Sequence, residues 1–76
     1  MKIHIIYLNE NILLSKGSYE NWQEIQEKYD GYKSSLGPWE IQDIREYLLD
    51  EYPDIYTNNK SDIENYLNNN QLELTL

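Results

Sequence analysis

Residues 2–16 read KIHIIYLNENILLSK and hold the pattern that decides the fold. Two apolar runs flank the connector Asn9-Glu10-Asn11, which has the length of a β-hairpin loop and contains Asn, a residue that tolerates a positive φ. Both faces of the first run are apolar, which indicates an interior strand of a sheet. We therefore expect strands at 2–8 and 12–16.

An amphipathic helix is expected over residues 19–30. Gly17-Ser18 ends the second strand, and Ser18 can cap a helix that begins at Tyr19. Gly31 is well placed to end this helix in a left-handed conformation. The apolar stripe consists of Trp22, Ile25 and Tyr29, and the acidic residues on the opposite side are Glu20, Glu24 and Glu27.

The next stretch, 32–37, has no periodicity and is predicted to be a loop. Pro38 then suits the first position of a second helix, and Pro53 ends that helix near residue 51 or 52. The predicted buried stripe of this helix is Ile41, Ile44, Leu48 and Tyr52, and the acids roughly opposite are Asp43, Glu46 and Asp50.

A third helix is predicted to open with the capping box Ser61 to Glu64 and to end at Asn68-Asn69-Asn70. Alternating leucines in 72–76 predict a last strand. The expected fold is therefore a small α+β domain of order ββαααβ, with a three-stranded sheet covered on one face by acidic helices. A chain of 76 residues is too short for two cores, so residues 1–76 are expected to form a single domain.

The composition argues for a soluble, cytoplasmic protein. The chain has no cysteine, so neither disulfides nor a thiolate zinc site can support it, and this fits a reducing compartment. The apolar run from Ile3 to Leu8 is far too short to cross a membrane.

Catalytic chemistry has little support in the residues. His4 is the only histidine and has no cysteine or glycine-flanked serine motif to act with, and the three glycines form no phosphate-binding loop. The acidic residues around 50–64 lack the ligand spacing of an EF-hand. We therefore expect no catalytic residue, no cofactor and no metal site.

Charge is the informative feature. Fourteen acids and six bases give a net charge of −8, which opposes direct binding to nucleic acid or to an anionic membrane. Residues 20–64 hold twelve of the acids and four of the bases, so the net charge resides in the predicted helical layer. Such a charge can serve solubility alone.

The two acidic rows suggest a more specific use. Carboxylates on adjacent helices can occupy the phosphate sites of a basic nucleic-acid-binding protein, and exposed aromatic residues can anchor the interface. The predicted partner-binding residues are Glu20, Glu24, Glu27, Trp39, Asp43, Glu46 and Asp50, with Tyr32, Tyr47 and Tyr56 as further anchors.

The chain makes heavy use of Ile, Asn, Tyr, Glu and Lys, which is typical of proteins from AT-rich genomes. In size, acidity and this residue usage, it resembles the small inhibitors that phages and mobile elements encode, such as anti-CRISPR and anti-restriction proteins. No motif carries this resemblance. The predicted function is a non-enzymatic, DNA-mimicking inhibitor of a basic nucleic-acid-binding protein. The alternatives are an acidic interaction module without mimicry, namely an antitoxin, an immunity protein or a self-associating subunit. A homodimer would use strand edges on the N-terminal hairpin or on 72–76.

Overall fold

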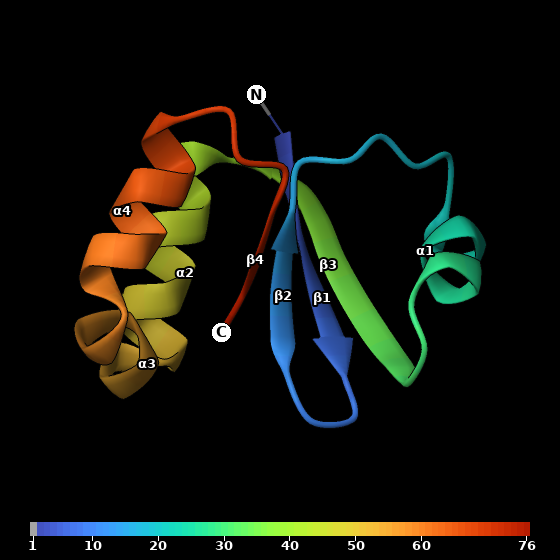
Figure 1. The fold of residues 1–76 in the computed structure, drawn as a ribbon, viewed down its shortest axis with the longest axis horizontal. Helices are drawn as coiled ribbons and strands as arrows, with labels where there is room; N and C mark the ends of the chain where they lie inside the picture. Colours follow the sequence, from blue (N-terminus) through green and yellow to red (C-terminus); the bar gives the residue numbers. More distant parts are fainter. Residues whose placement is uncertain (1) are drawn as a thin grey trace.

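The computed structural model describes residues 2–76, and along them four strands and four helices follow in the order ββαβαααβ (Figure 1). The strands are β1 (Lys2–Leu8), β2 (Ile12–Ser15), β3 (Tyr32–Glu40) and β4 (Glu73–Thr75). The helices are α1 (Trp22–Lys28), α2 (Ile41–Glu51), α3 (Pro53–Asn58) and α4 (Lys60–Asn68). The predicted α+β class is confirmed, whereas the predicted order ββαααβ is wrong because it lacks β3 and α3.

One antiparallel sheet contains all four strands in the order β3-β1-β2-β4. The N-terminal hairpin forms as predicted, and β1 lies between β2 and β3, which explains why both of its faces are apolar. The predicted three-stranded sheet is wrong, since β3 adds a fourth strand at one edge. β4 forms the other edge, at the position expected for the last strand.

β3 occupies residues for which the sequence predicts a loop and the start of a helix at Pro38, and both predictions are wrong. The pairing of β3 with β1 shifts register twice, between Ile3 and Ile5 and between Tyr7 and Leu8. These irregularities remove the two-residue alternation that identifies a strand in a sequence. Pro38 is tolerated because β3 is an edge strand.

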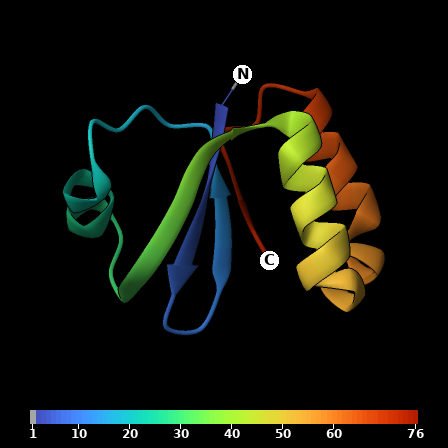
Figure 2. The ribbon, with the colours of Figure 1, turned by 180° about the vertical axis from the view of Figure 1, so that it is seen from behind.

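The helices lie on both sides of the sheet, so the prediction that they cover one face is wrong. In Figure 1 the sheet is seen nearly edge-on, with α1 on one side and α2, α3 and α4 on the other, and Figure 2 shows the same division from behind. The side chains of β1 alternate between the two sides: Ile3 and Ile5 contact the larger helical layer, and Ile6 packs with Ile25 of α1.

The side of α2, α3 and α4 holds the larger core. Ile44 and Leu48 of α2 are fully buried there, as their stripe predicts, together with Ile63 and Tyr66 of α4. Pro53 interrupts the helical chain after α2, as predicted, and starts α3. No side chain caps α4, whose N-cap is Asn59, so the predicted Ser61 to Glu64 capping box is wrong.

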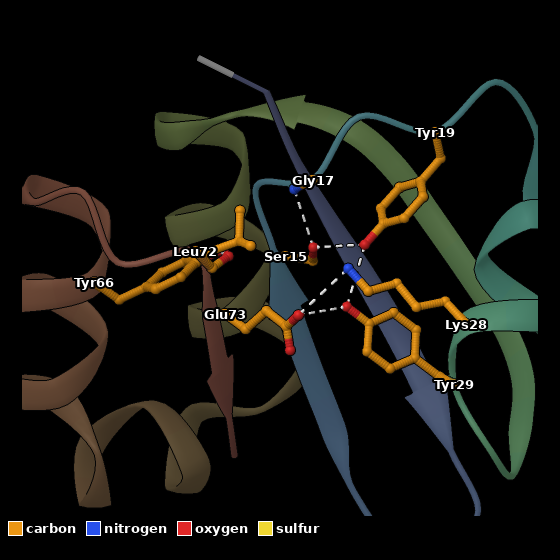
Figure 3. Close-up of polar contacts among 8 residues, drawn as sticks. All are labelled: Ser15, Gly17, Tyr19, Lys28, Tyr29, Tyr66, Leu72 and Glu73. Carbon is orange, nitrogen blue, oxygen red and sulfur yellow. Dashed lines mark hydrogen bonds and ion pairs between the residues drawn. The ribbon is translucent and has the colours of Figure 1, made fainter.

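The α1 side has little hydrocarbon and a chain of hydroxyl groups instead (Figure 3). Tyr29 donates its only hydroxyl proton to Glu73 at 2.9 Å, so Tyr19, 3.2 Å away, must donate to Tyr29. Ser15 then donates to Tyr19 at 3.0 Å, and its oxygen accepts the N–H of Gly17. This ordered chain ties the segment before α1 and the end of α1 to β2 and β4.

α1 is shorter than predicted. It begins after Asn21, whose side chain accepts the N–H of Glu24, so the predicted cap at Ser18 is wrong. Trp22, expected in the apolar stripe, is 55% exposed. Gly31 does adopt the predicted left-handed conformation, with φ +77°, in the turn between α1 and β3. Within residues 2–76, no helix is long and apolar enough to cross a membrane.

Candidate protein-binding site

The sheet separates the two predicted acidic rows. Glu20, Glu24 and Glu27 belong to the α1 side, whereas Asp43, Glu46 and Asp50 belong to α2 on the other side (Figure 1). The expectation that both rows project from adjacent helices is therefore wrong. Only the α2 row lies beside Trp39 and Tyr47, two of the aromatic residues predicted as anchors.

Local structure accounts for part of the α1 row. The Glu24 carboxylate accepts the backbone N–H of Glu20 at 3.2 Å, directly before the first turn of α1. A carboxylate at this position stabilises a helix start, both by hydrogen bonding and through the helix dipole. Glu24 is therefore a helix-stabilising residue, while Glu20 and Glu27 remain exposed.

On α2 the three acids form one row directed away from the core. Asp43, Glu46 and Asp50 lie within roughly 60° of each other around the helix axis, because each residue advances by about 100°. All three are exposed. Within residues 2–76, their only polar contact is a 3.3 Å hydrogen bond from Gln42 to Glu46, and no cation of this part of the chain pairs with them. The row is thus available to a cationic partner.

A shallow recess adjoins this row. It has a volume of about 330 Å³ and is lined by Trp39, Asp43, Glu46 and Tyr47. Trp39 comes from β3 and Tyr47 from α2, and their rings meet edge to face with centroids 5.1 Å apart. Four residues named by the sequence analysis therefore converge where the edge strand continues into α2.

Contacts with two other tyrosines fix the position of Tyr47 in the wall of the recess. The hydroxyls of Tyr7 and Tyr47 are 2.6 Å apart, and the ring of Tyr52 packs edge to face on Tyr47. Burial, followed by hydrogen bonds to Tyr47 and Tyr52, raises the pKa of Tyr7 above its ordinary value. The Tyr7 hydroxyl therefore stays protonated at neutral pH, and its hydrogen bond fixes the position of Tyr47.

The only base on α2 does not offset the acidic row. Arg45 makes two hydrogen bonds to the Glu64 carboxylate of α4, at 3.0 and 2.8 Å, and donates a third to Gln42. Arg45 first, and then Tyr56, lower the pKa of Glu64 to about 2, so the carboxylate is charged and neutralises the guanidinium. Between residues 40 and 54 six acids stand against this one base.

The remaining predicted anchors have different positions. Trp39 is half-buried rather than fully exposed, since it packs against the core of the α2 side. Tyr56 is only 7% exposed and donates its hydroxyl to Glu64, so it belongs to the interior. Tyr32 is half-buried on the α1 side, where it packs near Ile6. Of the three tyrosines, only Tyr47 lies in the recess.

Trp22 is an exposed aromatic residue that the sequence analysis assigned to the core. Its spacing from Ile25 and Tyr29 imitates an apolar stripe, but α1 has only seven residues and buries only Ile25. The nearby Asn21 is the sequence signal for a later start, because it is a favoured N-cap with Glu24 three residues on.

Across residues 2–76, no group of three or more histidine or acidic side chains is arranged to hold a metal ion. The sequence matches no known family model, and no match is found among curated proteins or solved structures. Only the geometry and charge of the chain itself therefore indicate a function.

Proposed function

We propose that this protein is a non-enzymatic inhibitor that binds a basic nucleic-acid-binding protein through the α2 face and the adjoining recess. The α2 face consists here of Asp43, Glu46, Asp50, Trp39 and Tyr47. In this arrangement the carboxylates take positions that nucleic-acid phosphates would occupy on the partner, and the recess receives an apolar or cationic side chain.

The observation that carries the proposal is the convergence of unpaired carboxylates on a rigid aromatic recess. Electrostatic complementarity steers association, and buried aromatic residues supply most of the energy of a typical interface. The Tyr7–Tyr47 hydrogen bond and the edge-to-face packing of Trp39 restrict these side chains before a partner arrives. A surface ordered in advance loses less entropy on binding.

Capture from extracts of the source cell tests the proposal. The expected partners are basic nucleic-acid-binding proteins, captured at low salt and released steeply as salt rises. Duplex DNA added to the extract should compete for the same partners, because both ligands would occupy one groove. Salt-independent capture of an acidic partner, or capture that DNA leaves unchanged, would contradict phosphate mimicry.

A matched pair of variants separates the α2 face from net charge. The triple variant Asp43→Asn, Glu46→Gln and Asp50→Asn should weaken capture by about tenfold or more. The control variant Glu10→Gln, Glu27→Gln and Asp30→Asn removes the same number of charges from exposed positions off the α2 face. Equal loss in both variants would show that only overall charge matters.

The alternative without mimicry remains an acidic interaction module. Its self-associating form is restricted by the sheet order, because β1 and β2 are both interior strands and the hairpin has no free edge for a second copy. Of the two places expected for a homodimer contact, the hairpin and residues 72–76, only the second contains an edge strand, β4. Light scattering at micromolar concentration tests this form, and a monomer mass would remove it.

A further inference from the structure

A second hollow lies on the opposite side of the sheet, between the start of α1 and the edge strand β3. It has a volume of about 310 Å³, at the lower end of the range typical for ligand pockets. Its walls come from the segment before α1, from the first turn of α1, from β1 and from the second half of β3. The lining residues used below are His4, Tyr19, Glu20, Trp22, Ile25 and Ser35.

His4 is a buried polar group in the wall of this hollow, and its side chain has no hydrogen-bond partner among residues 2–76. It is only 8% exposed, and its ring makes no hydrogen bond to any residue of the described chain. No fully buried side-chain nitrogen or oxygen among those residues lacks a partner. The unbonded nitrogens of His4 therefore lie at the small exposed part of the residue, which borders this hollow and an adjacent one.

Burial lowers the pKa of His4 below its ordinary value, so the imidazole is neutral at neutral pH. A neutral imidazole always carries one acceptor nitrogen. A buried polar group without a partner is uncommon in a folded protein, because each such group carries a desolvation cost. An unpaired acceptor in the wall of a hollow is thus available to a ligand.

The other walls favour a cation that donates hydrogen bonds. Glu20 is the only formally charged lining residue, and its carboxylate has no partner among residues 2–76. Trp22 contributes an aromatic ring, which attracts cations. The Tyr19 ring already has the Lys28 ammonium over it, 5.7 Å from the ring centroid. The backbone N–H groups of Glu20 and Glu24, which could otherwise attract an anion, are already bonded within the α1 cap.

An adjacent hollow of about 270 Å³ shares His4, Tyr19 and Pro38 with this one and includes Lys2 and Lys16. Neither lysine places a free charge at the site. The Lys2 ammonium pairs with Glu40 at 2.9 Å, and the Lys16 ammonium donates to the carbonyls of Tyr66 and Asn69 on the other side of the fold.

We propose that the hollow beside His4 binds a guanidinium group, with Glu20 as counter-ion, His4 as hydrogen-bond acceptor and the ring of Trp22 as stacking surface. A planar guanidinium suits these walls because it offers several donors in one plane and stacks on aromatic rings. If the proposed function holds, the group is an arginine of the basic partner. The site itself does not depend on that partner.

The test is a titration of the isolated protein with N-acetyl-arginine amide, followed by ¹H–¹⁵N NMR. The Trp22 indole signal and the amides of Ser35 and Gly37 should shift in a saturable manner, while the amide of Ile63, which is fully buried on the other side of the sheet, serves as an internal reference. N-acetyl-citrulline amide has nearly the same shape without the charge and should cause no comparable shifts. Equal shifts with both probes, or none with either, would overturn the proposal.

Variants assign the roles within the hollow. His4→Phe keeps a planar ring and removes the acceptor, and we expect it to lower the affinity for the arginine probe about tenfold. Glu20→Gln should lower the affinity for the probe to a similar extent. Glu27→Gln removes an exposed acid of α1 outside the hollow and should leave the affinity unchanged. A similar loss in all three variants would reduce the site to general attraction by an acidic protein.

Glu20→Ala provides a further check, because its effect does not depend on a change in the core. If His4→Phe fails to fold, loss of saturable shifts in Glu20→Ala still supports the site, and their retention contradicts it. The result also separates the two proposals. Probe binding without capture of a basic partner contradicts only the proposed function, whereas partner capture without probe binding contradicts only the guanidinium site.

Discussion

The two sides of the sheet are stabilised by different interactions. On the side of α2, α3 and α4, nine buried residues form one hydrocarbon core, whereas on the α1 side only Ile6, Leu13 and Ile25 are buried together. The α1 side relies instead on the hydroxyl chain from Ser15 to Glu73 (Figure 3). We therefore expect the core on the side of α2, α3 and α4 to supply most of the stability of the fold, and the α1 side to unfold locally more easily.

The largest expected effect comes from removing hydrocarbon on each side in turn. Ile44→Ala should lower the free energy of unfolding by about 3–4 kcal/mol, because Ile44 is fully buried within the larger core. Ile25→Ala should lower the free energy of unfolding by only about 2 kcal/mol, since few buried residues surround Ile25 and they can relax into the space that is left.

Urea denaturation of both variants measures the difference directly. Hydrogen exchange should in addition show that Ile25→Ala increases exchange mainly in α1, whereas Ile44→Ala increases it throughout the chain. Equal costs with equally global exchange would contradict the division into a stable and a looser layer.

A smaller effect is expected from the ion pair within the larger layer. The pKa of Glu64 is lowered from 4.5 to about 2, chiefly by Arg45 and then by Tyr56. The folded state therefore binds the proton more weakly than the unfolded state, so the ion pair stabilises the fold fully above about pH 4.5. This contribution falls as the pH drops from 4.5 through 2.

Glu64→Gln should thus cost about 1–2 kcal/mol at neutral pH, after allowance for the partial exposure of both partners. The difference from the parent protein should shrink as the pH approaches about 2. Unfolding measured over this range gives the result, with Glu27→Gln as an exposed control. A difference that stays constant with pH would exclude the ion pair as its cause.

The smallest effect is expected from the hydroxyl chain on the α1 side. Tyr29→Phe removes the donor to Glu73 and the acceptor for Tyr19, and we expect a cost of about 1 kcal/mol because Glu73 is partly exposed to water. The matched control on the other side is Tyr66→Phe, which removes one hydrogen bond to the Leu72 carbonyl.

Hydrogen exchange distinguishes these two tyrosine variants. Tyr29→Phe should increase exchange in α1, and Tyr66→Phe should leave α1 unchanged. If Tyr29→Phe does not alter α1, the hydroxyl chain has no role in holding that layer.

The helices and strands whose apolar residues are spaced in the sequence in the way typical of that element were predicted correctly. The apolar run of β1, with both of its faces apolar, and the stripe of Ile44 and Leu48 both identify buried residues correctly. β3 was missed because its half-buried residues are Tyr32, Ser35, Leu36 and Trp39, whose i, i+3, i+4, i+7 spacing is that of a helix and not of a strand. The register shifts that produce this spacing depend on pairing with β1.

The candidate site was predictable in composition but not in arrangement. The α2 row follows from helical spacing alone, and Trp39 and Tyr47 were named as anchors. Which side of the sheet each helix covers depends on how the chain crosses after β2 and β3, and short-range periodicity contains no information on that choice. The hollow beside His4 was missed for the same reason, because three stretches that are separate in the sequence form it.

The irregular course of β3 has a consequence for behaviour at high concentration. A sheet edge of nine residues could pair with strands from other molecules and start aggregation. Here two register shifts bend the edge, Pro38 has no N–H to donate, and Gly37 has a φ of +109° that an extended partner strand does not match. The features that hid this strand from the sequence analysis also protect the protein from forming fibrils along that edge.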